Sequence, residues 1–220
     1  MNIRTIRVTG KGLLKIKPDQ TCIFMDLEGV EEKYEDTVRR SSEDTKAVKD
    51  ALEKVGIAQE NVRTTSFDIE PQYEGYEEKG VWKQAFKGYR FTHSLRFVFD
   101  MDKELLGKIF GALAACPANP QFRVSYRVKD QESAKKLLLA SAVSDAKEKA
   151  EILTLAAGVS LKEIRHIDYS FGAVQMEVMP MNRLKAAGGV ACCADYEMSV
   201  DMNPEDIEVS DTVTVVWEIG

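Results

Sequence analysis

The stretch Asp130-Gln-Glu-Ser-Ala-Lys-Lys-Leu-Leu-Leu-Ala-Ser-Ala-Val-Ser-Asp-Ala-Lys-Glu-Lys-Ala-Glu-Ile-Leu-Thr-Leu-Ala-Ala-Gly158 decides the fold, and its pattern predicts one long helix. Asp130 suits the N-cap because its carboxylate accepts from the free backbone N–H groups of the first turn. Gly158 can adopt a left-handed conformation just past the last turn. Apolar residues recur between these ends at three- and four-residue spacing, which is typical of a helix packed on one face. They are Leu139, Ala142, Val143, Ala146, Ala150, Leu153 and Ala157.

The middle of this apolar stripe is alanine. Small side chains at Ala142, Ala146 and Ala150 let a helix axis come close to the surface on which it lies. The sequence on either side of the helix is rich in strand-forming residues. We therefore expect the helix to pack closely on a sheet.

Composition restricts the class of protein. The chain has 220 residues, 44% of them hydrophobic and 30% charged, which is typical of a soluble globular protein of one large or two small domains. A formal net charge of −6 argues against a protein built mainly to bind nucleic acid or an anionic membrane. Residues 1–10 contain no apolar segment typical of an export signal, which predicts a cytoplasmic location. The four cysteines, expected to be reduced, are Cys22, Cys116, Cys192 and Cys193.

The first part of the chain has the pattern of a split βαβ plait. A strand over residues 3–9 is expected to close in a turn at Gly10-Lys11-Gly12. The clearest alternation in the chain follows at residues 89–100, where Tyr89, Phe91 and Leu95 share one parity and predict a strand with one buried face. A polar hairpin tip is expected at 74–83. Further strands are predicted at 21–30, 64–73 and 122–128, and helices at 35–55 and 102–115.

The predicted fold class is α+β. A ferredoxin-like βαββαβ plait is expected over residues 19–128. Residues 1–18 and 129–220 are expected to form a second, smaller layer from the first strand, the long helix and two C-terminal strands near 163–171 and 208–219. In this arrangement the first and last strands meet. An irregular segment is predicted at 175–204.

Four motifs, taken together and in this order, resemble the SIMPL domain family. They are Gly10-Lys-Gly12 with Pro18-Asp19; Ile69-Glu-Pro71-Gln-Tyr73 followed by Gly88-Tyr89; Ala142, Asp145, Ala146, Lys149 and Ala150 of the helix; and Val213-Thr-Val-Val-Trp-Glu218. The resemblance implies an α+β fold and, as in several members, self-assembly into larger rings. It implies no catalytic residue. Many bacterial members begin with an export signal, which this sequence does not show.

Three candidate catalytic features have structural explanations. Gly10-Lys-Gly12 lacks both the third glycine of a dinucleotide fingerprint and the Gly-Lys-Ser/Thr of a P-loop. His93 and His166 have no carboxylate or cysteine at triad or ligand spacing, and His93 shares the parity of the aromatic row. The mid-helix serines Ser141 and Ser144 have no nucleophile elbow around them. The sequence therefore predicts no enzyme site.

Lys87-Gly88-Tyr89-Arg90-Phe91 matches the opening of the RNP1 signature of RNA-binding plaits. Base stacking needs exposed rings on the face of the sheet away from the helices, whereas Tyr89 and Phe91 continue a row that we expect to face the core. With the acidic net charge, RNA binding is the lesser alternative.

The irregular segment holds sulfur-bearing residues that could bind a soft metal such as Cu(I) or respond to oxidation. The metal candidates are Cys192, Cys193, Met179 and Met181. The favoured interpretation is a loop with adaptable methionine contacts and no metal or cofactor.

The function predicted from the sequence is a non-enzymatic, self-associating scaffold or protein-binding protein. The expected partners are further copies of the chain or an unidentified protein. The alternative is a metal- or redox-responsive protein that uses the loop at 175–204. Association is expected through the final strand, if that strand lies at a sheet edge, and through this loop.

Overall fold

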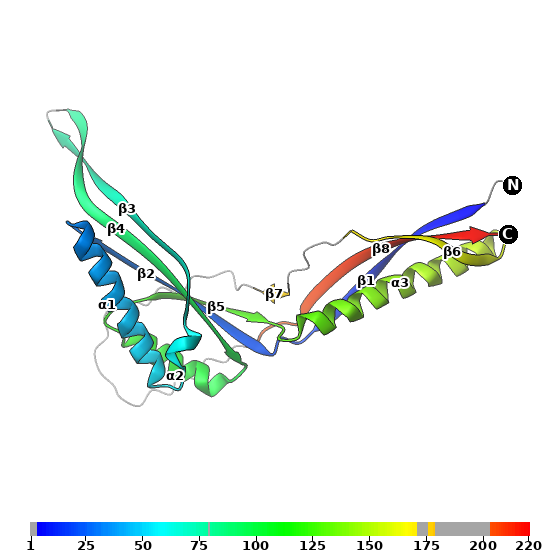
Figure 1. The fold of residues 1–220 in the computed structure, drawn as a ribbon, viewed down its shortest axis with the longest axis horizontal. Coiled ribbons are helices and arrows are strands. Elements are labelled where there is room, and N and C mark those ends of the chain that lie inside the picture. The colour runs from blue at the N-terminus through cyan, green and yellow to red at the C-terminus, as the bar shows by residue number, and fades with distance from the viewer. Residues whose placement is uncertain (1–3, 79, 171–175, 179–202) are drawn as a thin grey trace. The chain divides into compact units, whose positions relative to one another are not determined.

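The computed structural model describes residues 4–78, 80–170, 176–178 and 203–220. It combines helices with antiparallel sheets, so the predicted α+β class is confirmed (Figure 1). The chain forms two compact units. Unit 1 comprises residues 1–19, 127–178 and 204–220, and unit 2 comprises residues 20–126 and 179–203.

Unit 2 is a sheet covered by helices on one face. Its strands lie in the order β3-β4-β2-β5, and β2 and β3 both run antiparallel to β4. Side chains of α1 and α2 pack together with one face of this sheet in a single core. The elements are β2 (Gln20–Glu31), α1 (Tyr34–Glu53), a short 3-10 turn (Gln59–Asn61), β3 (Arg63–Glu78), β4 (Val81–Asp100), α2 (Lys103–Ala114) and β5 (Gln121–Arg127).

The core of unit 2 follows the alternation of its two central strands. Phe91, Leu95 and Phe97 of β4 are at most 1% exposed, which confirms the prediction of one buried face. Ile23 and Met25 of β2 are fully buried beside them. Because directly paired residues share a face, each of these strands contributes its odd-numbered side chains to the same core.

Helix α1 turns an unexpected face to the sheet. Its apolar residue Val38 is 38% exposed, whereas the polar residues Thr37 and Ser41 are buried. Thr37 Oγ1 donates to the carbonyl of Lys33 at 2.9 Å, so its hydroxyl is satisfied inside the helix. A buried hydroxyl with a partner is compatible with a helix face that packs on a sheet.

His93 of β4 lies among hydroxyl groups of α1 and β3. Its Nδ1 is 3.2 Å from Ser41 Oγ and 3.0 Å from Thr45 Oγ1, and its Nε2 is 2.9 Å from Thr64 Oγ1. Burial lowers the pKa of the imidazole, and the charge of Lys49 lowers it further. The histidine is packed, as predicted, and contacts hydroxyl groups.

We expect this histidine to make unit 2 less stable in mild acid. Because the folded-state pKa of His93 lies below its ordinary value of 6.5, the unfolded chain binds more protons and stability falls as the pH drops through this range. His93→Gln should flatten the dependence of the thermal midpoint on pH between about 7.5 and 5. His166→Gln, on exposed β6, is the control; equal flattening in both variants would contradict the assignment to His93.

Unit 1 is a three-stranded antiparallel sheet with one helix along it. Its order is β1-β8-β6, so the last strand lies between the other two. β1 and β8 pair from Thr5↔Glu218 to Ile16↔Ile207, which confirms that the first and last strands meet. The elements of this sheet and its helix are β1 (Thr5–Ile16), α3 (Gln131–Ala156), β6 (Leu161–Asp168) and β8 (Ile207–Ile219). The two-residue β7 (Glu177–Val178) is not a strand of this sheet.

Helix α3 begins and ends as predicted. The carboxylate of Asp130 accepts from the backbone N–H of Ser133 at 2.9 Å, and Gly158 has φ +68°. The apolar stripe was only partly right, because Val143 and Leu153 are 37% and 51% exposed. The buried row keeps a strict four-residue spacing, so residues three positions away turn toward solvent. The row is Ala134, Leu138, Ala142, Ala146, Ala150 and Thr154.

The predicted turn at Gly10-Lys11-Gly12 is wrong, because β1 runs straight through it. Both glycines face α3. A Cβ added at Gly10 would overlap the carbonyl oxygen of Ala142 and lie 2.7 Å from the Cβ of Ala146. A Cβ at Gly12 would overlap the carbonyl oxygen of Leu138. Glycine at positions 10 and 12 therefore allows β1 to approach α3 closely. The small alanine side chains of α3 allow the same approach from the side of the helix.

One carboxylate ties β1 to α3. Asp145 Oδ2 accepts from the backbone N–H of Lys11 at 2.6 Å and from Lys149 Nζ at 2.7 Å. The hydrogen bond from Lys149 and then the one from Lys11 lower the pKa of Asp145 below its ordinary value. The charged carboxylate therefore holds the strand at the position where Gly10 and Gly12 meet the helix.

Candidate interaction surface on the β3–β4 arm

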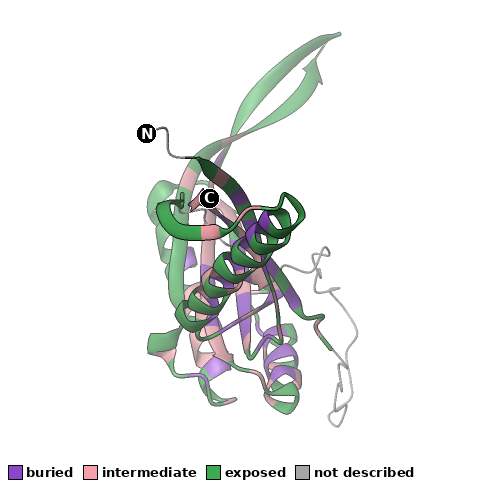
Figure 2. Cartoon of the chain, turned by 90° about the vertical axis from the view of Figure 1, so that its right-hand side faces the viewer, coloured by how far each residue is buried: buried purple, intermediate pink, exposed green. Residues whose placement is uncertain are grey.

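Residues 71–78 and 80–88 form a two-stranded ribbon, which we call the arm. β2 pairs with β4 only as far as Glu31↔Tyr89, whereas β3 continues to pair with β4 up to Glu78↔Val81. Figure 2 shows the arm as exposed along its length. The hairpin tip predicted as polar and mobile at 74–83 is therefore mostly strand.

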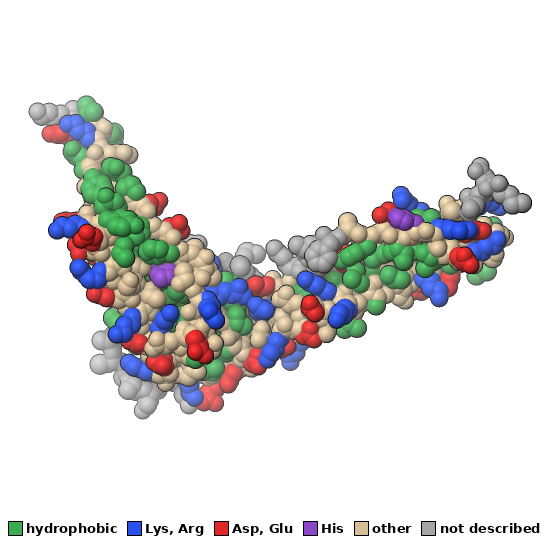
Figure 3. All heavy atoms as spheres, viewed as in Figure 1, with side chains coloured by type: hydrophobic (Ala, Val, Ile, Leu, Met, Phe, Trp, Pro, Cys, Tyr) green, Lys and Arg blue, Asp and Glu red, His purple; other side chains and the backbone are tan. Residues whose placement is uncertain are grey.

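One face of the arm is aromatic. Tyr73 pairs with Phe86 across the ribbon, their ring centroids 5.8 Å apart at 71°. The ring of Trp82 lies over Gly75, where an added Cβ would be 3.8 Å away. Tyr73, Trp82 and Phe86 are 56%, 75% and 50% exposed. Tyr73 and Phe86 pack on each other, and all three rings remain largely in water. We call this surface the aromatic face (Figure 3).

The opposite face of the arm carries ion pairs. Lys83 Nζ lies 2.6 Å from Glu78 Oε2, and Lys87 Nζ lies 3.2 Å from Glu74 Oε2. The strand period of two separates these side chains from the aromatic face. Tyr76 and Val81 lie on the charged face. The two faces therefore differ in their predominant side chains, although Glu77, opposite Trp82, shares the aromatic face.

Aromatic contacts join the arm to the body of unit 2. The Phe86 ring meets Tyr89 at 5.3 Å, and Tyr89 meets Tyr34 of α1 at 5.6 Å, both edge to face. Gly88 stands between arm and body with φ +145°, where an added Cβ would overlap the carbonyl oxygen of Glu31. This backbone conformation is open to glycine and strained for other residues.

The arm has the physical properties of a binding surface for protein. A two-stranded hairpin alone is marginally stable in water and gains stability when a further layer covers its apolar face. Exposed Trp and Tyr supply large contact areas at little entropic cost. The arrangement can bind an apolar or aromatic surface of a partner.

A smaller apolar patch lies on unit 1. Ile164 and Ile167 of β6 are 51% and 49% exposed, and Val143 of α3 is 37% exposed. β6 lies at one edge of its sheet, whereas β8 is paired on both sides. The final strand is therefore no sheet edge, because β6 occupies its second side, so the condition attached to association through this strand is not met. Association itself stays a prediction.

The residues proposed from sequence as metal ligands cannot be placed. Cys192, Cys193, Met179 and Met181 lie outside the described residues, so their roles stay predictions. In the described part of the chain, no three or more His, Cys, Asp and Glu side chains are grouped to hold a metal ion. The RNP1-like motif is brought to the core, because Phe91 is fully buried there.

Sequence reasoning missed the aromatic face. It described residues 74–83 by their glycines and charges, although Trp82, Gln84 and Phe86 already share a strand parity. A tryptophan within a polar hairpin is the signal that could have identified the surface, because large aromatic residues seldom lie in water without a partner.

Two curated relatives and one solved structure are similar to this chain. The 26 kDa periplasmic immunogenic protein of Brucella abortus (strain S19) is 26% identical over 97% of this chain and 84% of its own. The protein of the same name from Brucella melitensis biotype 1 matches with the same identity and coverage. CutA from Synechococcus elongatus PCC7942 matches at 14% identity and a TM-score of 0.23, over 59% of this chain and 95% of its own, which supports no inference.

These relatives correct the predicted location. Both are named periplasmic proteins, so the cytoplasmic location inferred from the sequence is wrong. The inference rested on the absence of an apolar segment in residues 1–10, and an absence of this kind does not determine a location. Among the residues that the structure describes, no helix has the length and apolar character needed to span a membrane.

The family model described as SIMPL, protein of unknown function (DUF541), matches residues 6–217. This match includes every helix and nearly all of both sheets. The chain therefore belongs to the SIMPL family.

Proposed function

We propose that this protein is a non-enzymatic, self-associating protein whose aromatic face packs against another copy of the chain. The observation that carries the proposal is the exposure of Tyr73, Trp82 and Phe86 on one side of a two-stranded ribbon. Unit 2 has its own core, formed by β2, β4, α1 and α2, so it does not need these three rings in order to fold. The likeness to periplasmic proteins supports a role in the cell envelope.

Charge favours a second copy as the partner of the arm. The chain carries a net charge of −6, so two copies repel each other weakly overall. Residues 71–88 contain three acids, Glu74, Glu77 and Glu78, and three bases, Lys79, Lys83 and Lys87, and are neutral in sum. The arm therefore adds no net charge to a contact between two copies.

The geometry of the arm also suits self-pairing. A symmetric dimer places the same patch of both copies in contact, so the patch must complement itself. Flat aromatic rings satisfy this requirement because they stack or meet edge to face with their own kind. The charged face stays in water in such a pair, and its internal ion pairs Lys83–Glu78 and Lys87–Glu74 remain intact.

Light scattering coupled to size exclusion tests the proposal. We expect the purified chain to elute with a mass that is a multiple of 24.6 kDa at micromolar concentration. The Trp82→Ala, Phe86→Ala double variant should dissociate at least about tenfold more readily, since buried aromatic anchors dominate interface energies. Tyr76→Ala, an aromatic truncation on the charged face, is the matched control.

Two outcomes would contradict the proposal. One is a monomer mass at high concentration of the unmodified protein. The other is an assembly that the double variant leaves intact while its circular dichroism is unchanged, which would assign association to another surface. The patch with Ile164 and Ile167 on β6 is then the next surface to substitute.

A further inference from the structure

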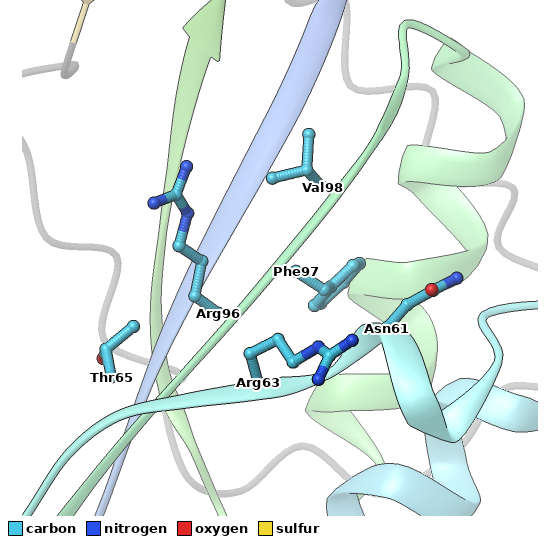
Figure 4. Close-up of a pocket in the computed structure, with 6 residues that line it drawn as sticks. All are labelled: Asn61, Arg63, Thr65, Arg96, Phe97 and Val98. Atoms are coloured by element: carbon cyan, nitrogen blue, oxygen red, sulfur yellow. The ribbon is translucent and has the colours of Figure 1, made fainter.

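A shallow hollow of about 390 Å³ lies in unit 2 where β3 begins, away from the arm. This volume is in the range of small-molecule sites. Figure 4 shows two arginines projecting from neighbouring strands, Arg63 toward Asn61 and Arg96 away from it. The lining residues are Asn61, Arg63, Thr65, Arg96, Phe97 and Val98.

The two arginines are direct cross-strand partners. Arg63 of β3 is paired with Arg96 of β4, so their side chains leave the sheet on the same face. Like charges in this position destabilise a sheet unless something neutralises them. This arginine pair therefore does not stabilise the sheet, which indicates that it has a role in binding and not in folding.

No carboxylate neutralises this pair within the described part of the chain. Arg63 makes no ion pair or hydrogen bond there. Arg96 donates from Nε to Cys22 Sγ at 3.0 Å and lies 5.3 Å from the ring centroid of Phe24, and it forms an ion pair with no acid of the described ranges. Arg123, on the other side of the same ring, differs because it has Asp26 at 3.9 Å.

Local backbone structure adds polar groups to the hollow. The β3–β4 ladder ends at Arg63↔Arg96, so Phe97 and Val98 have no partner residue on β3. Because backbone groups of a strand point alternately to its two neighbours, one of these residues directs its N–H and C=O toward the hollow. A bulge between Thr64 and Ser66 places Thr65 at the rim, and bulges commonly re-aim side chains at binding sites.

We infer that this hollow, the arginine site, binds a small molecule with two linked oxyanion groups of the phosphate class. Two arginines line one hollow, so it offers positive charge to a ligand that carries negative charge at two points. The planar fork of arginine donates two parallel hydrogen bonds to a phosphate group. The amide of Asn61 can donate a further hydrogen bond at the Arg63 side.

The volume and the charge both favour a doubly anionic group over a single carboxylate. A monocarboxylate would neutralise only one of the two arginines, whereas two linked phosphates neutralise both. Two phosphate groups alone do not fill the hollow, so an organic part of the ligand can occupy the remaining volume. The site is independent of the arm, so either assignment can fail without the other.

Isothermal titration of the full chain with inorganic pyrophosphate, and separately with inorganic phosphate, tests the inference. At constant ionic strength we expect saturable pyrophosphate binding with a Kd of about 1 mM or tighter, and phosphate binding at least about tenfold weaker. Arg63→Gln and Arg96→Gln should each weaken pyrophosphate binding by about tenfold or more. Arg39→Gln, on exposed α1, is the charge-matched control and should leave binding within about twofold.

Arg96→Gln removes the contacts of Arg96 to Cys22 and Phe24, so it can change the local structure as well as ligand binding. Arg63→Gln is the variant that tests binding without this complication. Within the described residues the Arg63 side chain makes no hydrogen bond or ion pair that its removal would break, and the loss of like-charge repulsion should leave the thermal midpoint unchanged or raise it. Absence of saturable binding would overturn the inference. Equal weakening in Arg39→Gln would also overturn it, because binding would then reflect overall charge.

Discussion

Gly10→Ala should cause the largest loss of stability of any single methyl group added to this protein. The new Cβ would overlap the backbone of α3 at Ala142 and Ala146, which cannot rotate away as a side chain could. The helix would have to lift from the sheet along the row that buries Ala142, Ala146 and Ala150. Overpacking against side chains costs about 1 to 3 kcal/mol, so we expect about 3 kcal/mol or more here.

Urea unfolding followed by circular dichroism measures this effect. Gly75→Ala is the control, because Gly75 is also a strand glycine but an added Cβ meets only the Trp82 ring at 3.8 Å. It should change the free energy of unfolding by no more than about 0.5 kcal/mol. If the two variants lost equal stability, the close approach of β1 to α3 would be refuted.

Gly88→Ala should cause the second largest loss of stability, and it should also weaken the strand pairing at the base of the arm. Gly88 has φ +145°, a conformation that is strained for alanine, and its added Cβ would also overlap the carbonyl oxygen of Glu31. We expect a loss of about 2 to 4 kcal/mol, the sum of backbone strain and steric displacement. Hydrogen exchange should accelerate at the paired ends Glu31 and Tyr89.

Gly80→Ala separates these two contributions. Gly80 has φ +77° at the arm tip, but nothing lies within 4 Å of an added Cβ. This variant therefore measures backbone strain alone, which is about 1 kcal/mol at an exposed turn. Equal losses at both positions would show that the carbonyl of Glu31 does not constrain the base of the arm.

Local signals in the sequence predicted the elements that they control. Asp130 and Gly158 each act within one helical turn, so their residue types were sufficient to place both ends of α3. The buried parity of Phe91, Leu95 and Phe97 was likewise visible, because alternation is a property of the strand itself. The α+β class followed from these elements.

Features that depend on distant segments could not be predicted in this way. Glycines at 10 and 12 usually indicate a turn, and only the approach of α3, more than a hundred residues later, explains them as strand residues. The neighbours of β8 were undetermined for the same reason, since sheet order does not follow from strand propensity. The Arg63–Arg96 pair of the arginine site also exists only once the register of β3 and β4 is fixed.

The central place of β8 in its sheet determines when unit 1 can form during synthesis. β1 is the first strand to be made, and its partner β8 follows after about 190 further residues. β6 also depends on β8, because it pairs with no other strand of its sheet. The elements β2 to β5 are available long before, so unit 2 can fold while β1 still has both of its backbone edges open. Until β8 is made, β1 is a strand without a partner that a chaperone or another nascent chain can bind.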